Sequence, residues 1–104
     1  MQKIAFTMKL HEGFEEEYKR RHDAIWPELT SLLHETGIRE YSIFLDEESR
    51  VLFGVLQIDD PSKLDELPGK AIMQKWWAYM QDIMDSNPDH SPVSRPLKPV
   101  FYLP

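Results

Sequence analysis

Apolar and polar residues alternate strictly at the start of the chain. From Lys3 to Leu10 every second residue is apolar, beginning with Ile4. This spacing is typical of a strand with one buried face. After a turn at His11–Gly13 the apolar spacing becomes that of a helix, which begins near Phe14. Gly37 is placed to end this helix as a C-terminal cap.

A proline interrupts the predicted helix. Pro27 has no amide hydrogen, and its ring clashes with the carbonyl four residues earlier, at Asp23. Two interpretations remain open: one helix kinked at the proline, or a second helix with Pro27 in its first position. Tyr18 and His22 precede the break and share a face in either case. The position of Trp26 depends on which interpretation holds.

A predicted hairpin follows the helical region. Residues Ile38–Leu45 and Val51–Ile58 have strand patterns, and the polar turn between them makes a hairpin the natural connection. A short helix is expected from near Pro61 to Gly69. A longer helix is expected from about Lys70 to Met84, because its apolar residues repeat at helical spacing.

The end of the chain is rich in proline. From Asn87 to Pro104 it holds five of the eight prolines, which favours an extended course over a helix. Val100–Leu103 is nevertheless apolar enough to form a final strand. The predicted order of elements is therefore β-α-β-β-α-β.

This order predicts an α+β fold of the ferredoxin-like type, with one antiparallel sheet and the helices on one of its faces. We expect a single domain over residues 1–104, because the chain is too short for two ordinary domains. The other face of the sheet needs a cover. A second copy of the chain is the expected cover, which predicts a homodimer of the α+β barrel type.

Composition excludes several classes of function. The net charge is −6, which argues against binding to nucleic acid or an anionic membrane. The one basic run, Lys19–Arg21, follows Glu15–Glu17 and is explained by ion pairs along a helix. There is no cysteine for disulfides, thiolate catalysis or cysteine-based metal sites. Without an apolar run of about 20 residues or a signal peptide, a cytoplasmic protein is expected.

The strongest candidate for chemistry is a set of side chains spaced four apart: Tyr18, His22 and Trp26. Residues at this spacing share a helix face, and an imidazole has an ordinary pKa of about 6.5, close to neutral pH. His22 is open to three interpretations: a hydrogen-bonded histidine at the edge of the core, a ligand-binding or catalytic residue, or a metal ligand. No two of the four histidines have the close spacing of a metal-binding motif.

Trp76 and Trp77 form a second aromatic group. Adjacent residues on a helix diverge by about 100°, so one of the two rings can simply pack in the core. The functional alternative is carbohydrate binding, in which flat rings cover the C–H faces of a sugar. Tyr41, on a neighbouring strand, could add a phenol. No glycine-rich phosphate loop and no GxSxG motif is present.

Several motifs together resemble the L-rhamnose mutarotase family. They are YKRRHDAIWPEL, YSIFLD, QKWWAYM, NPDHSPVS and VFYLP, and they extend over nearly the whole chain. The resemblance implies a cytoplasmic homodimer that interconverts the α and β anomers of L-rhamnose without a cofactor, as part of L-rhamnose metabolism. It also implies that His22 is the proton donor. It further implies that Tyr18, Tyr41, Trp76 and Trp77 bind the sugar.

The mechanism leaves one role open. Ring opening needs a proton delivered to the ring oxygen and another removed from the anomeric hydroxyl. The residues suggest either water or a carboxylate of Asp85–Asp89 as the base. Three other functions compete with the mutarotase: a cofactor-free monooxygenase of phenols, a sugar-binding module without catalysis, and a purely structural dimer module.

Overall fold

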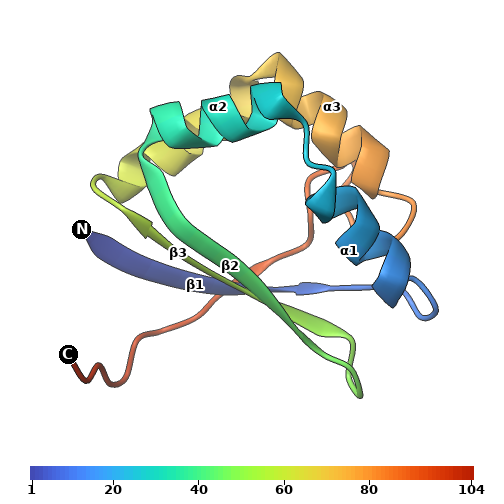
Figure 1. Ribbon diagram of the computed structural model, residues 1–104, viewed down its shortest axis with the longest axis horizontal. Helices are drawn as coiled ribbons and strands as arrows, with labels where there is room; N and C mark the ends of the chain where they lie inside the picture. The colour runs from blue at the N-terminus through green and yellow to red at the C-terminus, as the bar shows by residue number, and fades with distance from the viewer.

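The computed structural model describes residues 1–104 as one antiparallel sheet with its helices over one face (Figure 1). The strands run in the order β2-β3-β1-β4 across the sheet. They are β1 (Gln2–Lys9), β2 (Ile38–Asp46), β3 (Val51–Ile58) and β4 (Arg95–Pro96). The helices are α1 (Glu15–Asp23), α2 (Pro27–Thr36), the 3-10 helix η1 (Pro61–Gly69) and α3 (Ala71–Met80). The predicted α+β class and single antiparallel sheet are confirmed.

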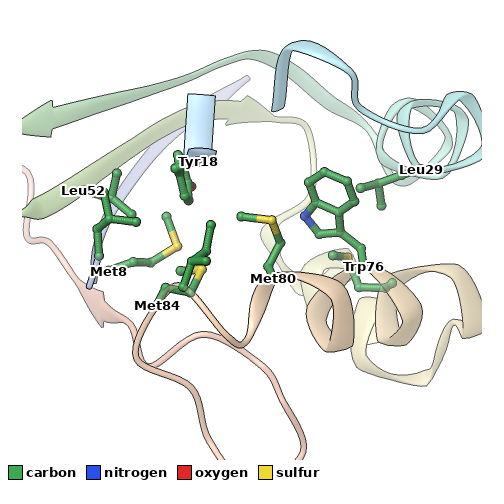
Figure 2. Close-up of a cluster of buried hydrophobic side chains, with 10 residues drawn as sticks. Met8, Tyr18, Leu29, Leu52, Trp76, Met80 and Met84 are labelled. Atoms are coloured by element: carbon green, nitrogen blue, oxygen red, sulfur yellow. The ribbon is translucent and has the colours of Figure 1, made fainter. Parts of the chain in front are cut away.

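The core lies between the sheet and the helices. Met8 on β1 pairs with Leu52 on β3, and both are buried beneath the helices. Figure 2 shows their side chains meeting those of Tyr18 and Met84. A smaller cluster centred on Ile58 continues the core along the sheet. The alternation in the sequence thus gives the sheet its buried face.

The structure decides between the two interpretations at Pro27. A new helix, α2, begins at this residue, with Trp26 as its extended N-cap. Proline loses nothing in the first position, where its missing amide hydrogen would have no helical partner. Gly37 ends α2 in a left-handed conformation with φ of 101°, as its sequence position predicts.

The prediction that the last helix reaches Met84 is wrong, because α3 ends at Met80. The next residues pair with the end of β1 instead: the Leu10 and Met84 backbones form a bridge, and the Asp85 amide donates to the Lys9 carbonyl at 3.0 Å. Met84 is therefore buried by contact with the sheet and not by continuing the helix.

The predicted final strand at Val100–Leu103 is also wrong. The fourth strand is only Arg95–Pro96, paired with Phe6 and Thr7 of β1. One more amide, from Leu97, donates to the Ala5 carbonyl. Pro99 then has no amide to continue the ladder. Beyond it the chain leaves the sheet, and Figure 1 shows the C-terminus away from the helices.

The sheet face away from the helices is uncovered in one chain and carries exposed aromatic rings on β2 and β3. Phe44 lies opposite Phe53, and the two side chains are 64% and 36% exposed. The homodimer remains a prediction, and this face is where it would form. None of the helices has the length and apolarity needed to cross a membrane.

Candidate active site

A large cleft lies between the helices and the sheet, with a volume of about 1550 Å³. Most of its lining residues are hydrophobic. The structure brings all five residues predicted for the site to this cleft; they are Tyr18, His22, Tyr41, Trp76 and Trp77. They come from α1, β2 and α3, so the site depends on the tertiary fold.

Helix α1 supplies the imidazole and one phenol. Tyr18 and His22 lie one turn apart, and their rings stack with centroids 4.2 Å apart. His22 Nδ1 lies 3.1 Å from the backbone oxygen of Tyr18. A carbonyl oxygen only accepts hydrogen bonds, so Nδ1 carries a hydrogen and donates it. Nε2 is therefore the nitrogen left for chemistry.

Burial sets the protonation of His22. Desolvation lowers its pKa below the ordinary value, since burial disfavours the charged imidazolium. The Tyr18 carbonyl and the Asp23 carboxylate act in the opposite direction but do not outweigh burial. At neutral pH the ring is mainly neutral, with a hydrogen on Nδ1 and a lone pair on Nε2.

Tyr41 reaches the cleft because of a β-bulge. The pairing of β2 with β3 shifts between Arg39 and Ser42, and Glu40 has a φ of 51°. Such an extra residue redirects the side chains around it. The Tyr41 ring lies over the buried face, 6.1 Å from the ring of Phe6. The bulge thus directs the Tyr41 side chain toward the cleft, whereas regular pairing would direct it differently.

Both phenols stay protonated. Tyr18 is only 7% exposed, and burial raises its pKa above the ordinary value, with a further increase from nearby Tyr41. Tyr41 is 38% exposed, yet desolvation of its hydroxyl in the cleft also raises its pKa. Neither shift involves a hydrogen bond to another protein group. The two hydroxyls are therefore available as donors to a ligand.

Tryptophan rings form one wall. Trp76 is 5% exposed and meets His22 edge-on, with centroids 5.3 Å apart. Trp26, which the sequence grouped with Tyr18 and His22, does not line the cleft; it packs against Trp76 with centroids 5.1 Å apart in the same T-shaped geometry. Figure 2 shows Trp76 and Tyr18 entering the core from opposite sides of Met80. Trp77, the next residue on α3, is partly buried and also lines the cleft.

The loop before β4 adds a polar edge. Asn87, Ser91 and Ser94 line the cleft. The Asn87 side-chain amide donates to Ser91 Oγ at 3.1 Å and to the Pro92 carbonyl at 3.3 Å. Both amide hydrogens are then in use, and the amide oxygen can still accept from a ligand.

The carboxylates considered as a base lie elsewhere. Neither Asp85 nor Asp89 lines the cleft. Asp85 accepts from His11 at 3.1 Å, and Asp89 accepts from the amide of Ser91. Nowhere do three His, Cys, Asp or Glu side chains gather in a way that could hold a metal ion.

Sequence reasoning missed two aromatic residues near the site: Tyr79, which packs against Trp76 but does not line the cleft, and Phe6, which does. Tyr79 lies 5.6 Å from Trp76 and 5.5 Å from Trp26. The spacing of three between Trp76 and Tyr79 was the available signal, because residues three apart are neighbours on a helix. Phe6 forms part of the floor of the cleft and was predicted only as a core residue.

Comparisons with known proteins agree over the whole chain. Residues 3–103 match the family model described as L-rhamnose mutarotase. An L-rhamnose mutarotase of Brucella anthropi is 56% identical over 99% of this chain and 97% of its own length. An L-rhamnose mutarotase of Flavobacterium johnsoniae is 57% identical over 95% of this chain and 92% of its own length.

Solved structures show the same similarity. The crystal structure of an L-rhamnose mutarotase from Formosa agariphila matches with a TM-score of 0.93 and 47% identity, covering all of both chains. A Mycobacterium tuberculosis protein matches with a TM-score of 0.61 over 96% of this chain and 95% of its own, at only 15% identity. That second similarity concerns the fold alone.

Proposed function

This chain belongs to the L-rhamnose mutarotase family, and on that premise we propose that it interconverts the α and β anomers of L-rhamnose, with His22 moving the proton and no cofactor taking part. The reaction would serve L-rhamnose metabolism in the cytoplasm. As an isomerisation of a sugar at one carbon, it needs no oxidant, reductant or second substrate.

One observation carries the proposal: polar atoms without protein partners face an apolar, aromatic cleft. His22 Nε2 and the hydroxyls of Tyr18 and Tyr41 have no hydrogen-bond partner in the protein, and none of them is sealed off from the cleft, so a bound ligand can reach all three. Sugar hydroxyl groups can satisfy all three, because each hydroxyl both donates and accepts hydrogen bonds. The rings of Trp76 and Trp77 favour a ligand that also has apolar faces. A deoxyhexose has both.

We infer a proton shuttle on one imidazole. Neutral His22 accepts the proton of the anomeric hydroxyl at Nε2, while the bond between C1 and the ring oxygen breaks and C1 becomes the aldehyde. The resulting imidazolium donates that proton to the ring oxygen, which leaves as a hydroxyl. The two oxygens share C1, so a single nitrogen can serve both. Rotation of the aldehyde and reversal of the steps give the other anomer.

The phenols and indoles have separate roles in this scheme. Because their pKa values are raised, Tyr18 and Tyr41 donate hydrogen bonds to sugar oxygens and do not compete with His22 for protons. Trp76 and Trp77 contact the apolar face of the ring and the 6-deoxy methyl group. A positioned acid or base contributes roughly 10²–10⁴-fold to such a reaction.

The dimer belongs to the same proposal. We propose that the ferredoxin-like sheets of two chains pack through their uncovered faces, around Phe44 and Phe53, and form a barrel-type homodimer. The support is the exposure of these rings in a single chain. Burial of apolar surface is the main favourable term in association.

Saturation-transfer NMR between the two anomeric protons of L-rhamnose tests the proposed activity. The exchange rate should rise in proportion to protein concentration. L-mannose, which carries a hydroxymethyl group where rhamnose has its methyl, should be a poorer substrate in this apolar cleft. Broadening of the rhamnose signals without faster exchange would instead identify a sugar-binding module and contradict the proposal.

A further inference from the structure

The residue before His22 connects two helices of the site. Arg21 lies on α1, and its side chain is only 10% exposed. Its Nε donates to Glu17 one turn earlier at 2.7 Å. Its Nη1 donates to Asp82 Oδ1 at 2.8 Å, and Nη2 reaches Asp82 Oδ2 at 3.3 Å. One guanidinium therefore joins α1 to the segment that follows α3.

The same guanidinium caps the end of α3. Arg21 Nη1 also donates to the backbone oxygen of Tyr79 at 2.7 Å. Tyr79 lies in the last turn of α3, where carbonyl groups have no partner within the helix and carry partial negative charge. A cation from another helix satisfies both needs. The contact also fixes where α3 ends relative to α1.

Aromatic contacts extend from this joint to the imidazole. The Arg21 guanidinium carbon lies 4.5 Å from the centroid of the Tyr79 ring. The Tyr79 ring packs on Trp76 at 5.6 Å, and Trp76 meets His22 at 5.3 Å. Helices α1 and α3 are thus joined at two places, by Arg21 with Tyr79 and by His22 with Trp76.

We propose that Arg21 is a positioning residue, which fixes α1 against the C-terminal end of α3 and so holds His22 at its working distance from the Trp76 wall. This inference rests on the proposed mutarotase function and refines it. Arg21 does not line the cleft and does not touch the sugar.

The role requires arginine and not only a positive charge. Three acceptors, on Glu17, Asp82 and the Tyr79 backbone, surround a planar group with five donors. Lysine offers a single nitrogen on a flexible stem and cannot stack on Tyr79 in the same way. Arg21→Lys therefore keeps the positive charge and removes the planar set of hydrogen-bond donors. Arg21→Gln removes both.

The experiment measures kcat and KM for anomer exchange in wild type, Arg21→Lys and Arg21→Gln. The control is Lys63→Gln, which breaks an ion pair between η1 and Asp59 just before it and lies outside the cleft. Misplacing a reacting group by about 1 Å can cost on the order of 10²-fold. We expect kcat to fall roughly 10- to 100-fold in both Arg21 variants. KM should change much less, and the control should match wild type.

Two further readouts separate positioning from simple stabilisation. The His22 imidazole proton signals in NMR should move in the folded Arg21 variants, because the ring current of Trp76 acts on them. Asp82→Asn should lower kcat in the same direction, and combining it with Arg21→Gln should add little to Arg21→Gln alone, since the two side chains act as one unit.

Folded Arg21 variants that melt at lower temperature but keep wild-type kcat and unchanged His22 signals would overturn the inference and leave the proposed function intact. Fully additive losses for Arg21→Gln and Asp82→Asn would also overturn it. If the wild-type protein showed no anomer exchange, the proposed function would fail, and this inference with it.

Discussion

At the scale of single residues, His22 has two nitrogens with different tasks. Nδ1 is tied to the Tyr18 carbonyl of its own helix, and Nε2 belongs to the cleft. The hydrogen bond thus fixes the tautomer as well as the orientation of the ring. The i, i+4 spacing predicted that Tyr18 and His22 share a helix face, whereas the hydrogen bond to the Tyr18 carbonyl came from the structure.

The lowered pKa of His22 predicts the pH dependence of catalysis. Nε2 must be unprotonated to accept the anomeric proton, so kcat/KM should be level around neutral pH. It should fall as the pH drops through a value below about 6.5, the ordinary pKa of histidine. Rates of anomer exchange from about pH 4 to about pH 8, corrected for the spontaneous reaction, measure this.

The opposite slope would contradict the shuttle. If kcat/KM rose as the pH fell through the same value, the resting group would be the imidazolium. A separate base would then be needed at the anomeric hydroxyl. An NMR titration of the His22 ring protons would assign the inflection to this residue.

Among the other site residues, only some were accessible to sequence reasoning. Tyr18 shares the helix face of His22, and that relation is local. The direction of the Tyr41 side chain depends on a bulge that exists only when β2 pairs with β3, so the position of Tyr41 in the sequence was no more than a weak clue. The resemblance to a known family supplied what the residue pattern could not.

At the scale of elements, the floor of the cleft depends on a missing side chain. A Cβ at Gly54 of β3 would lie 2.5 Å from the ring of Phe6. Glycine therefore lets the Phe6 ring approach the β3 backbone closely, with the Tyr41 ring 6.1 Å away. This close approach explains the glycine within a strand that is otherwise rich in large apolar residues.

Gly54→Ala should push Phe6 into the cleft and disturb Tyr41. Overpacking of this kind costs about 1–3 kcal/mol in the free energy of unfolding, and KM for L-rhamnose should rise. Gly69→Ala is the matched control, because a Cβ there meets nothing within 4 Å. Urea unfolding and exchange kinetics measure both effects. Equal behaviour of the two variants would show that the close contact with Phe6 is unimportant.

Element boundaries were predictable where local signals act alone. Gly37 was predicted to end α2 and does, whereas Pro27 left a kink and a new helix equally open until the structure showed that α2 begins there. The end of α3 was not predictable, because it depends on contacts with distant residues. The Met84 backbone pairs with Leu10 after β1, and the Tyr79 carbonyl accepts a hydrogen bond from Arg21. The fourth strand was not predictable either: it lies at Arg95–Pro96, where it pairs with the edge of β1 that β3 leaves free.

At the scale of the whole molecule, hydrophobic patterning predicted the sheet and its buried face but could not show the cleft. The cleft is lined by side chains of α1, α2 and α3 together with Phe6 and Tyr41 of the sheet, and Figure 1 shows how these helices arch over one face of the sheet. Such space depends on how side chains from distant segments meet. The spacing of apolar residues along the chain therefore does not predict the cleft.

The uncovered sheet face predicts association. Phe44→Asp places a charge where one 64% exposed ring now lies, and it should convert a dimer into a monomer. Sedimentation equilibrium should give about twice the chain mass of 12.3 kDa for wild type and the single mass for the variant. Far-UV circular dichroism checks that the variant is folded. A wild-type protein that sediments as a monomer would contradict the proposed dimer.

The most direct test of the central claim replaces the imidazole and leaves the walls of the cleft in place. In His22→Gln, anomer exchange at saturating L-rhamnose should fall by roughly 10²–10⁴-fold. Binding of the sugar, measured by calorimetry, should stay within about threefold of wild type, because the phenols and indoles remain. Near-normal exchange in a variant that still binds rhamnose would show that His22 does not carry the proton.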